Sequence, residues 1–310
     1  MKETQGDTIG LTREEHAVYS CICYFNIFHY PMKPSEICDF ANVKVGTDQI
    51  MPILQHLISL GLAFENQGYY SIKSPHEQDV KRRIRSEQRC LRKQKIIRRF
   101  ALFISRFPYV ESVSISGSCS KGLLDEEGDV DYFIITSAGR LWFCRSFLIA
   151  FKKICLLNSK KYFCLNYFVD ADNLEIPDRN IFVASEIKTL KPISNKALFE
   201  KFLQSNAWAD EFLPNKVNNR ESFLRSSRPR KFLFRWVEII FNNRIGSAID
   251  DYCFHLTYAV WKKKFRHLNT DDFDLNFRSK KNVSKHHPGG FQKKVLGEMG
   301  NRLQNIKVLS

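Results

Sequence analysis

The amino-acid sequence predicts an α/β (α+β) protein with a mixed sheet, an N-terminal helical module and a helical C-terminal region. Residues 112–177 alternate strand-like apolar runs with a long amphipathic helix, a pattern typical of a sheet covered by helices. Residues 12–73 contain three short helical patterns followed by a hairpin pattern. With 310 residues, of which 44% are hydrophobic, the chain is long enough to bury a core, which excludes a disordered basic tail protein.

The net charge of +15 favours polyanionic partners such as nucleic acid, nucleotides or a lipid surface. The nine cysteines show neither a CxxC pair nor zinc-ligand spacing, so we expect reduced thiols in a cytoplasmic protein of bacterial type. The N-terminus lacks the apolar segment of a signal peptide. Charged residues interrupt the most apolar stretch, residues 141–157, and we therefore expect no membrane-spanning segment.

Residues 1–75 are predicted to form a winged-helix-like module. Apolar residues recur at helical spacing in residues 17–28, 37–41 and 50–60. A turn at residues 66–68 then separates two short strand patterns. Three short helices and a hairpin within about 60 residues form the outline of a winged helix, a variant of the helix-turn-helix motif.

The outward face of the third predicted helix bears on DNA binding by this module. A winged helix ordinarily places its third helix in the DNA major groove, where lysine and arginine contact phosphates. We expect neither residue on this face, and the hairpin turn contributes the acidic Glu65. The outward positions are Asp48, Gln49, Pro52, Gln55, His56 and Ser59. We therefore expect weak DNA binding at most and favour a dimerisation or packing role.

Residues 76–106 carry the densest basic run and are predicted to form a helical connector. Ten lysines or arginines lie within residues 81–99, a stretch that keeps near-helical apolar spacing. This basic face is either solvated or attracts phosphate groups. Further basic clusters lie in residues 220–235 and 262–285. Residues 196–265 are predicted to be helical, and residues 266–310 to be a basic, partly flexible tail.

Residues 116–135 contain glycine, serine and aspartate residues at a spacing that is typical of a ligand-binding site. An apolar strand pattern ends in Gly117 and Ser118, and after a polar loop Asp129 and Asp131 open the next strand pattern. Two carboxylates at i and i+2 of a strand lie on the same face, so both can reach one divalent cation or a pair of them. A glycine lets backbone amides approach a phosphate, and a serine adds a hydroxyl donor. The segment therefore predicts a magnesium–nucleotide site.

This segment resembles the signature of the nucleotidyltransferases of the DNA polymerase beta superfamily. The likeness rests on Gly117 and Ser118, on the twelve-residue spacing from Gly117 to Asp129, on the Asp-x-Asp pair, and on Lys121 followed by Gly122 in the loop. A weaker likeness over the whole chain extends to bacterial members with an N-terminal winged helix and a helical C-terminus. The resemblance implies a nucleotidyltransferase domain over residues 107–195.

The resemblance also implies a magnesium-dependent transfer of a nucleoside monophosphate from an NTP to an acceptor. In such a site Asp129 and Asp131 hold two Mg²⁺ ions that bridge the triphosphate and the acceptor hydroxyl. Ser118 would contact the β or γ phosphate, and Lys121 would either neutralise the leaving charge or be solvated. We find no motif for the acceptor, which is a small molecule, an RNA or a protein.

The strand that supplies a third carboxylate in active members of this superfamily carries an amide here. Asn166 aligns with that position, and an amide can coordinate a metal but cannot act as a base. Asp170 shares its face by alternation and is the other candidate metal ligand, although it lies about 13 Å further along the strand. The alternative function is therefore a catalytically degenerate nucleotide-binding or DNA-associated regulatory protein that uses the winged helix as an interaction module.

Two further candidates have a simpler interpretation. Cys119 lies inside the Gly-Ser turn, but the sequence offers no base beside it, so we interpret it as a small packing residue at a helix start. His286 and His287 could bind a metal. Their place in a polar, basic segment favours an exposed and inert pair.

Overall fold

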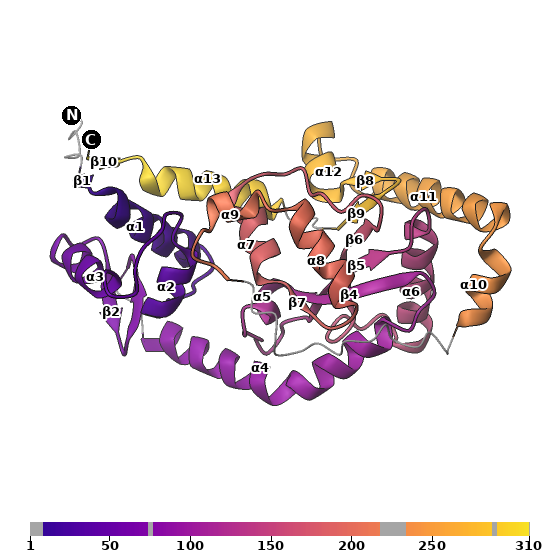
Figure 1. The fold of residues 1–310 in the computed structure, drawn as a ribbon, viewed down its shortest axis with the longest axis horizontal. Helices are drawn as coiled ribbons and strands as arrows, with labels where there is room; N and C mark the ends of the chain where they lie inside the picture. Colours follow the sequence, from indigo (N-terminus) through magenta and orange to yellow (C-terminus); the bar gives the residue numbers. More distant parts are fainter. Residues whose placement is uncertain (1–8, 74–76, 218–233, 287–289, 310) are drawn as a thin grey trace.

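A six-stranded sheet forms the centre of the molecule (Figure 1). The structure, a computed structural model, describes residues 9–73, 77–217, 234–286 and 290–309. The strands are β4 (Val110–Ser116), β5 (Asp131–Thr136), β6 (Cys164–Asp170), β7 (Lys191–Pro192), β8 (Ser279–Lys280) and β9 (Val283–Lys285). In the order β7-β4-β5-β6-β9-β8, β5 is antiparallel to β4 and parallel to β6, and β9 is antiparallel to β6. The protein therefore has the mixed α/β architecture that the sequence predicts.

Helices cover both faces of the sheet, because the central strands are apolar on both sides. Tyr132 and Ile134 of β5 belong to one apolar cluster, and Phe133 and Ile135 belong to the other. The first cluster includes residues of α6 (Leu141–Cys155) and α11 (Arg244–Lys264), and the second includes residues of α7 (Ile181–Thr189), α8 (Lys196–Ser205) and α9 (Ala209–Phe212). No helix in the described part of the chain has the length and apolar composition needed to cross a bilayer.

The N-terminal part contains three helices and a hairpin at the positions that the sequence predicts. These elements are α1 (Arg13–Asn26), α2 (Pro34–Phe40), α3 (Ile50–Ser59) and the antiparallel strands β2 (Phe64–Asn66) and β3 (Tyr69–Ser71). α1 begins with a capping box, in which the side chains of Thr12 and Glu15 each accept a hydrogen bond from the other's backbone N–H. All six outward positions predicted for the third helix, from Asp48 to Ser59, are exposed.

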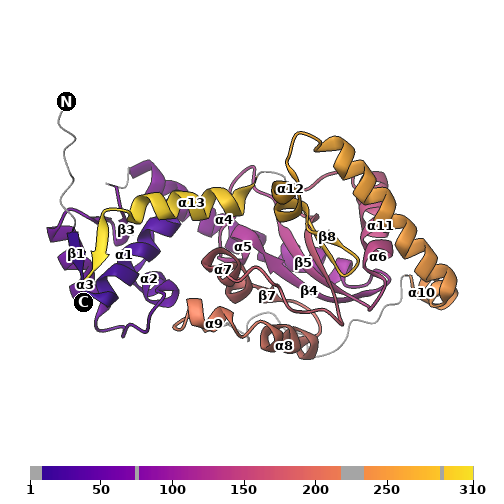
Figure 2. The ribbon, with the colours of Figure 1, turned by 90° about the horizontal axis from the view of Figure 1, so that it is seen from above.

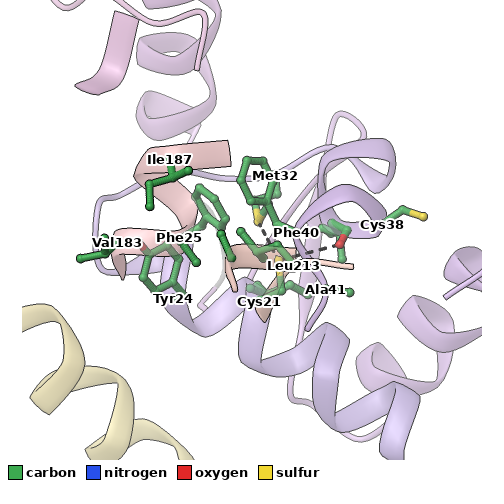
Figure 3. Packing of buried hydrophobic residues seen from close by; sticks show 14 of the residues in the cluster. Cys21, Tyr24, Phe25, Met32, Cys38, Phe40, Ala41, Val183, Ile187 and Leu213 are labelled. Atoms are coloured by element: carbon green, nitrogen blue, oxygen red, sulfur yellow. Dashed lines mark hydrogen bonds between the residues drawn. The ribbon is translucent and has the colours of Figure 1, made fainter. Parts of the chain in front are cut away.

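One apolar cluster joins this N-terminal module to the sheet. Figure 3 shows Tyr24 and Phe25 of α1 beside Val183 and Ile187 of α7, with Leu213 in the same group. All five side chains are buried. Burial of aromatic and aliphatic side chains is the main favourable term in folding, so the two parts of the chain stabilise each other.

The C-terminal residues return to both parts, and the described residues of the predicted tail, residues 266–310, form helices and strands. After α12 (Thr270–Phe277), strands β8 and β9 extend the sheet. α13 (Phe291–Leu303) packs on α1, and β10 (Ile306–Val308) pairs in parallel with β1 (Ile9–Leu11) (Figure 2). Strands of two or three residues are too short to show a period, so the sequence pattern did not reveal them.

A single helix, α4 (Glu77–Ile104), occupies the segment predicted as the basic connector and runs from the N-terminal module to the sheet (Figure 1). Arg83 of α4 is buried, and its guanidinium lies 3.7 Å from the centre of the Tyr30 ring. It also pairs with Glu36 and Glu87 at 2.6 Å each. This buried charge ties α4 to the module. Another side of α4 is exposed and basic, with Arg85, Arg92, Lys93, Lys95 and Arg99.

We expect Arg83→Ala to lower the free energy of unfolding by about 3 kcal/mol or more, because it leaves Glu36 without its ion-pair partner and Glu87 with Lys33 alone. Arg85→Ala is the matched control, since it removes an exposed arginine two residues further along the same helix, and it should change stability by less than about 0.5 kcal/mol. Urea unfolding of both variants measures the difference. Equal losses in the two variants would contradict the role of Arg83.

Candidate functional site

The Gly-Ser turn and the first residue of β5 meet at one end of the sheet. β4 ends at Ser116, which pairs with Asp131, and the short helix α5 (Gly117–Ser120) follows at once. Gly117 has a φ of +63°, and a Cβ atom built on it would lie 2.5 Å from Asp131 Oδ2. Both the left-handed backbone and the adjacent carboxylate require glycine at this position. The glycine of the sequence motif thus packs directly on a carboxylate of the predicted site.

Asp131 is held by Asn166, the amide on the neighbouring strand β6. Asn166 Nδ2 donates a hydrogen bond to Asp131 Oδ1, and the Cys164 thiol donates one to Asn166 Oδ1 at 3.2 Å. Burial raises the pKa of Asp131 to about 6, and the charges of Glu186 and Asp129 act in the same direction. A carboxyl whose pKa is raised by burial beside other acids is typical of functional sites.

Asp129 and Ser118 lie at the more open side of this end of the sheet. Asp129 is half-buried in the loop before β5, and its charge acts on Asp131. Within the described part of the chain, its carboxylate forms neither a hydrogen bond nor an ion pair. Ser118 is exposed on α5. The two predicted metal ligands are therefore close enough to interact, and the predicted phosphate contact is accessible to solvent.

Glu186 of α7 is a further carboxylate of the site, and sequence reasoning missed it. Lys121 Nζ lies 2.7 Å from Glu186 Oε1, so the lysine predicted to be solvated or to contact phosphate is paired with this glutamate. Glu186 also contributes to the raised pKa of Asp131. Its position in a helix far along the chain carried no local signal, because no motif connects α7 with the Gly-Ser turn.

A cavity of about 90 Å³ opens beside Asp131. Gly117, Asp131, Asn166 and Glu186 line it together with apolar side chains, which include Phe133, Ile176, Phe182, Val183, Ile187 and Leu190. Lys285 of β9 also lines the cavity, and its Nζ donates a hydrogen bond to Gln292 Oε1 at 2.9 Å. Burial lowers the pKa of Lys285 to about 8. The segment expected to be a flexible tail therefore contributes a cation to the cavity.

Asp170, the other candidate metal ligand, lies at the opposite end of the strands. It pairs with Thr136, at the far end of β5 from Asp131. Its two carboxylate oxygens accept hydrogen bonds from the backbone N–H groups of Gly139, at 2.7 Å, and Asp172, at 2.8 Å. It does not line the cavity. The structure therefore does not place Asp170 beside Asp131. The alternation of side chains predicts which face of a strand a residue occupies, but it does not predict how far along the strand the residue lies.

Of the two histidines predicted as a candidate metal-binding pair, the structure describes His286. The ring of His286 packs against Trp261 and Phe277, with centroid distances of 5.1 and 5.4 Å, so it is not the inert exposed residue that we expected. His287 and most of the basic cluster of residues 220–235 lie outside the described residues. Among the residues that the structure describes, no three His, Cys, Asp or Glu side chains form a group that could hold a metal ion.

Comparison of the chain with protein-family models, with curated proteins and with solved structures finds no match. The features of the site are the mixed sheet, the glycine turn between β4 and β5, and the half-buried Asp131 beneath that turn.

We expect Asp131→Asn to stabilise the protein at pH 7.5 in the absence of metal. Because the pKa of Asp131 is about 6 in the folded protein, above its unfolded value, this group stabilises the fold only at low pH, and the stabilisation is lost as the pH rises from about 4 to about 6. Asparagine stays neutral and can still accept the hydrogen bond from Asn166. The gain should be about 1–2 kcal/mol for this partly exposed group and should vanish near pH 4, as measured by urea unfolding.

Asp170→Asn is the matched control, with the opposite sign. Asparagine offers one acceptor oxygen where Asp170 uses two, so one backbone N–H loses its partner and the variant should lose about 1–3 kcal/mol at pH 7.5. Destabilisation by Asp131→Asn at this pH would contradict the assignment of Asp131 as a carboxylate that is costly to ionise.

Proposed function

We propose that this protein is a magnesium-dependent nucleotidyltransferase, which transfers a nucleoside monophosphate from an NTP to a hydroxyl or phosphate of an acceptor. The observation that carries the proposal is the packing of Gly117 on Asp131, with Asp129 beside it. A glycine turn and a carboxylate pair in this order resemble the nucleotidyltransferases of the DNA polymerase beta superfamily. A nucleotidyltransferase fold over residues 107–195 is part of the same proposal.

The side chains at this end of the sheet fit a divalent cation. Asp129 and Asp131 supply carboxylate oxygens, which are the ligands that Mg²⁺ prefers. Because burial makes Asp131 costly to ionise, a dication beside it would offset that cost. Asn166 adds at most a neutral oxygen. When bound, magnesium ions would stabilise the charge of the triphosphate and of the departing pyrophosphate.

The triphosphate would bind at the exposed edge formed by Gly117 and Ser118. The cavity beside Asp131, at about 90 Å³, is smaller than ordinary ligand pockets of roughly 300 Å³ or more, so a nucleotide does not fit inside it. The exposed hydroxyl of Ser118 can donate a hydrogen bond to a phosphate oxygen. Lys121 is paired with Glu186, so a phosphate must compete with that carboxylate for its ammonium group.

A second candidate function is nucleotide binding without turnover, and Asn166 is the observation that favours it. The position of the third carboxylate carries an amide, which bonds to Asp131 and cannot take a proton from an attacking hydroxyl. Glu186 lines the same cavity and is a carboxylate that could act as the base. Its pairing with Lys121 opposes that role, because a base must release its partner before it accepts a proton.

We propose that the N-terminal module, a winged helix in outline, serves in packing or interaction and not in reading DNA. The exposed face of α3 in the described residues carries neither lysine nor arginine. Met51, Ile58 and Leu60 add apolar surface there. Such a surface fits a protein partner better than a phosphate backbone.

Incubation with each of the four α-labelled NTPs and Mg²⁺, with RNA, protein and small-molecule extracts as acceptors, tests the transfer. We expect the double variant Asp129→Asn/Asp131→Asn to lose at least about 100-fold in label transfer, because both metal-binding charges are removed. Asp125→Asn is the matched control: it changes a carboxylate of the same loop that pairs with the exposed Arg82, and it should retain activity within about twofold.

Calorimetry with the magnesium complex of each NTP separates the two candidate functions. If the wild-type protein binds nucleotide, the double variant does not, and no acceptor becomes labelled, the result would favour nucleotide binding without turnover. Label transfer that persists in the double variant, or the absence of magnesium-dependent binding at millimolar nucleotide, would contradict both functions.

Duplex DNA should bind weakly, and through α4 instead of α3. We expect Arg92→Glu/Lys95→Glu to weaken binding by about tenfold, since it reverses two charges on an exposed basic face. Gln55→Ala/Ser59→Ala, on the outward face of α3, should leave binding unchanged within about twofold. Fluorescence anisotropy at two salt concentrations measures both effects. A larger loss from the α3 variant would show that α3 does contact DNA.

A further inference from the structure

Two thiols from distant segments meet beside the Gly-Ser turn. Cys119 lies in α5, directly after Ser118, and Cys90 lies near the middle of α4. Their Sγ atoms are 3.7 Å apart, and both cysteines are free. Because a disulfide needs about 2.05 Å between its sulfur atoms, a movement of roughly 1.7 Å would join them.

The surroundings give the two thiols different roles. Cys119 is buried, whereas Cys90 is half-buried and within reach of a small molecule from solvent. The hydrogen bond from Cys119, with the charge of the nearby Lys191, holds the pKa of the Cys90 thiol below its usual range. The thiolate is the form that reacts with oxidants. Cys90 is therefore placed to react first, and Cys119 to attack the product.

We propose that Cys90 and Cys119 form a reversible disulfide when the protein meets a hydroperoxide. With hydrogen peroxide, the Cys90 sulfur attacks one peroxide oxygen, which gives a sulfenic acid and one water. The Cys119 thiol then attacks the Cys90 sulfur and a second water leaves. Two thiols are oxidised to one disulfide while one peroxide is reduced to two waters, and an external thiol reverses the reaction.

The disulfide would join α4 to the turn that covers Asp131. The loop after this turn already rests on α4, since the Leu124 N–H donates to the Ser86 carbonyl and the Arg89 guanidinium donates to the Leu124 carbonyl, each at 3.2 Å. A covalent link would be added where the loop meets the candidate site. This inference does not rest on the proposed function, because it requires only the two thiols and an oxidant.

Oxidation of the full-length Cys155→Ser variant with hydrogen peroxide tests the proposal, since this substitution removes an exposed cysteine and leaves eight of the nine thiols. The protein is then unfolded and alkylated without reductant. We expect six alkylated cysteines and a tryptic product in which residues 90–92 are linked to residues 107–121, with a mass lower by two hydrogens than that of the two peptides. Dithiothreitol should restore both thiols. Full alkylation of Cys90 and Cys119, or their linkage to other cysteines, would overturn the proposal.

Two further substitutions in the same background separate the roles of the thiols. In Cys119→Ser the sulfenic acid on Cys90 has no partner, so dimedone should label Cys90. In Cys90→Ser the buried Cys119 should stay reduced under the same treatment. The assignment of Cys90 as the reacting thiol would be overturned if dimedone labelled Cys119 in the Cys90→Ser variant and left Cys90 unlabelled in the Cys119→Ser variant.

Discussion

The burial of β5 on both faces is the constraint on which the candidate site depends. Residues 132–136 of this strand are all buried, and only its first residue, Asp131, keeps partial access to solvent and to the cavity. A carboxylate at the start of a covered strand is held firmly without being fully enclosed. The chain must then turn closely above it, and Gly117 is the residue that permits this turn.

Local patterns predict the part of the site that lies within consecutive or neighbouring elements. β4, α5 and β5 follow one another along the chain, so glycine spacing and strand alternation were enough to predict that Gly117 and Asp131 belong to one site. Asn166 was predictable because it lies on the strand beside β5, where it now bonds to Asp131. For Asp170 the same alternation was not enough, because it carries no information on which end of the sheet a residue occupies.

The rest of the site comes from segments that only tertiary packing brings together. Glu186 comes from α7 and Lys285 from β9, and the neighbouring Cys119 meets Cys90 from α4. In the sequence each of these residues fits a local pattern, such as a helix face or a basic run. That pattern gave no reason to assign the residue to the site. Strand β9 is an extreme case, since three residues have no measurable period and their conformation is set by pairing with β6. For that reason the strands within residues 266–310, predicted as a partly flexible tail, had no signal in the sequence.

The ion pairs around the candidate site limit how the positive net charge can act there. Arg82 and Arg89 of α4 pair with Asp125 and Glu126, in the loop that leads to Asp129, and Lys121 pairs with Glu186. These three cations are thus already paired with carboxylates, and Lys285, which lines the cavity, bonds to the Gln292 amide. A triphosphate that approached Asp129 and Asp131 alone would add negative charge to two carboxylates. Under the proposed function, the nucleotide must therefore reach this site as its magnesium complex.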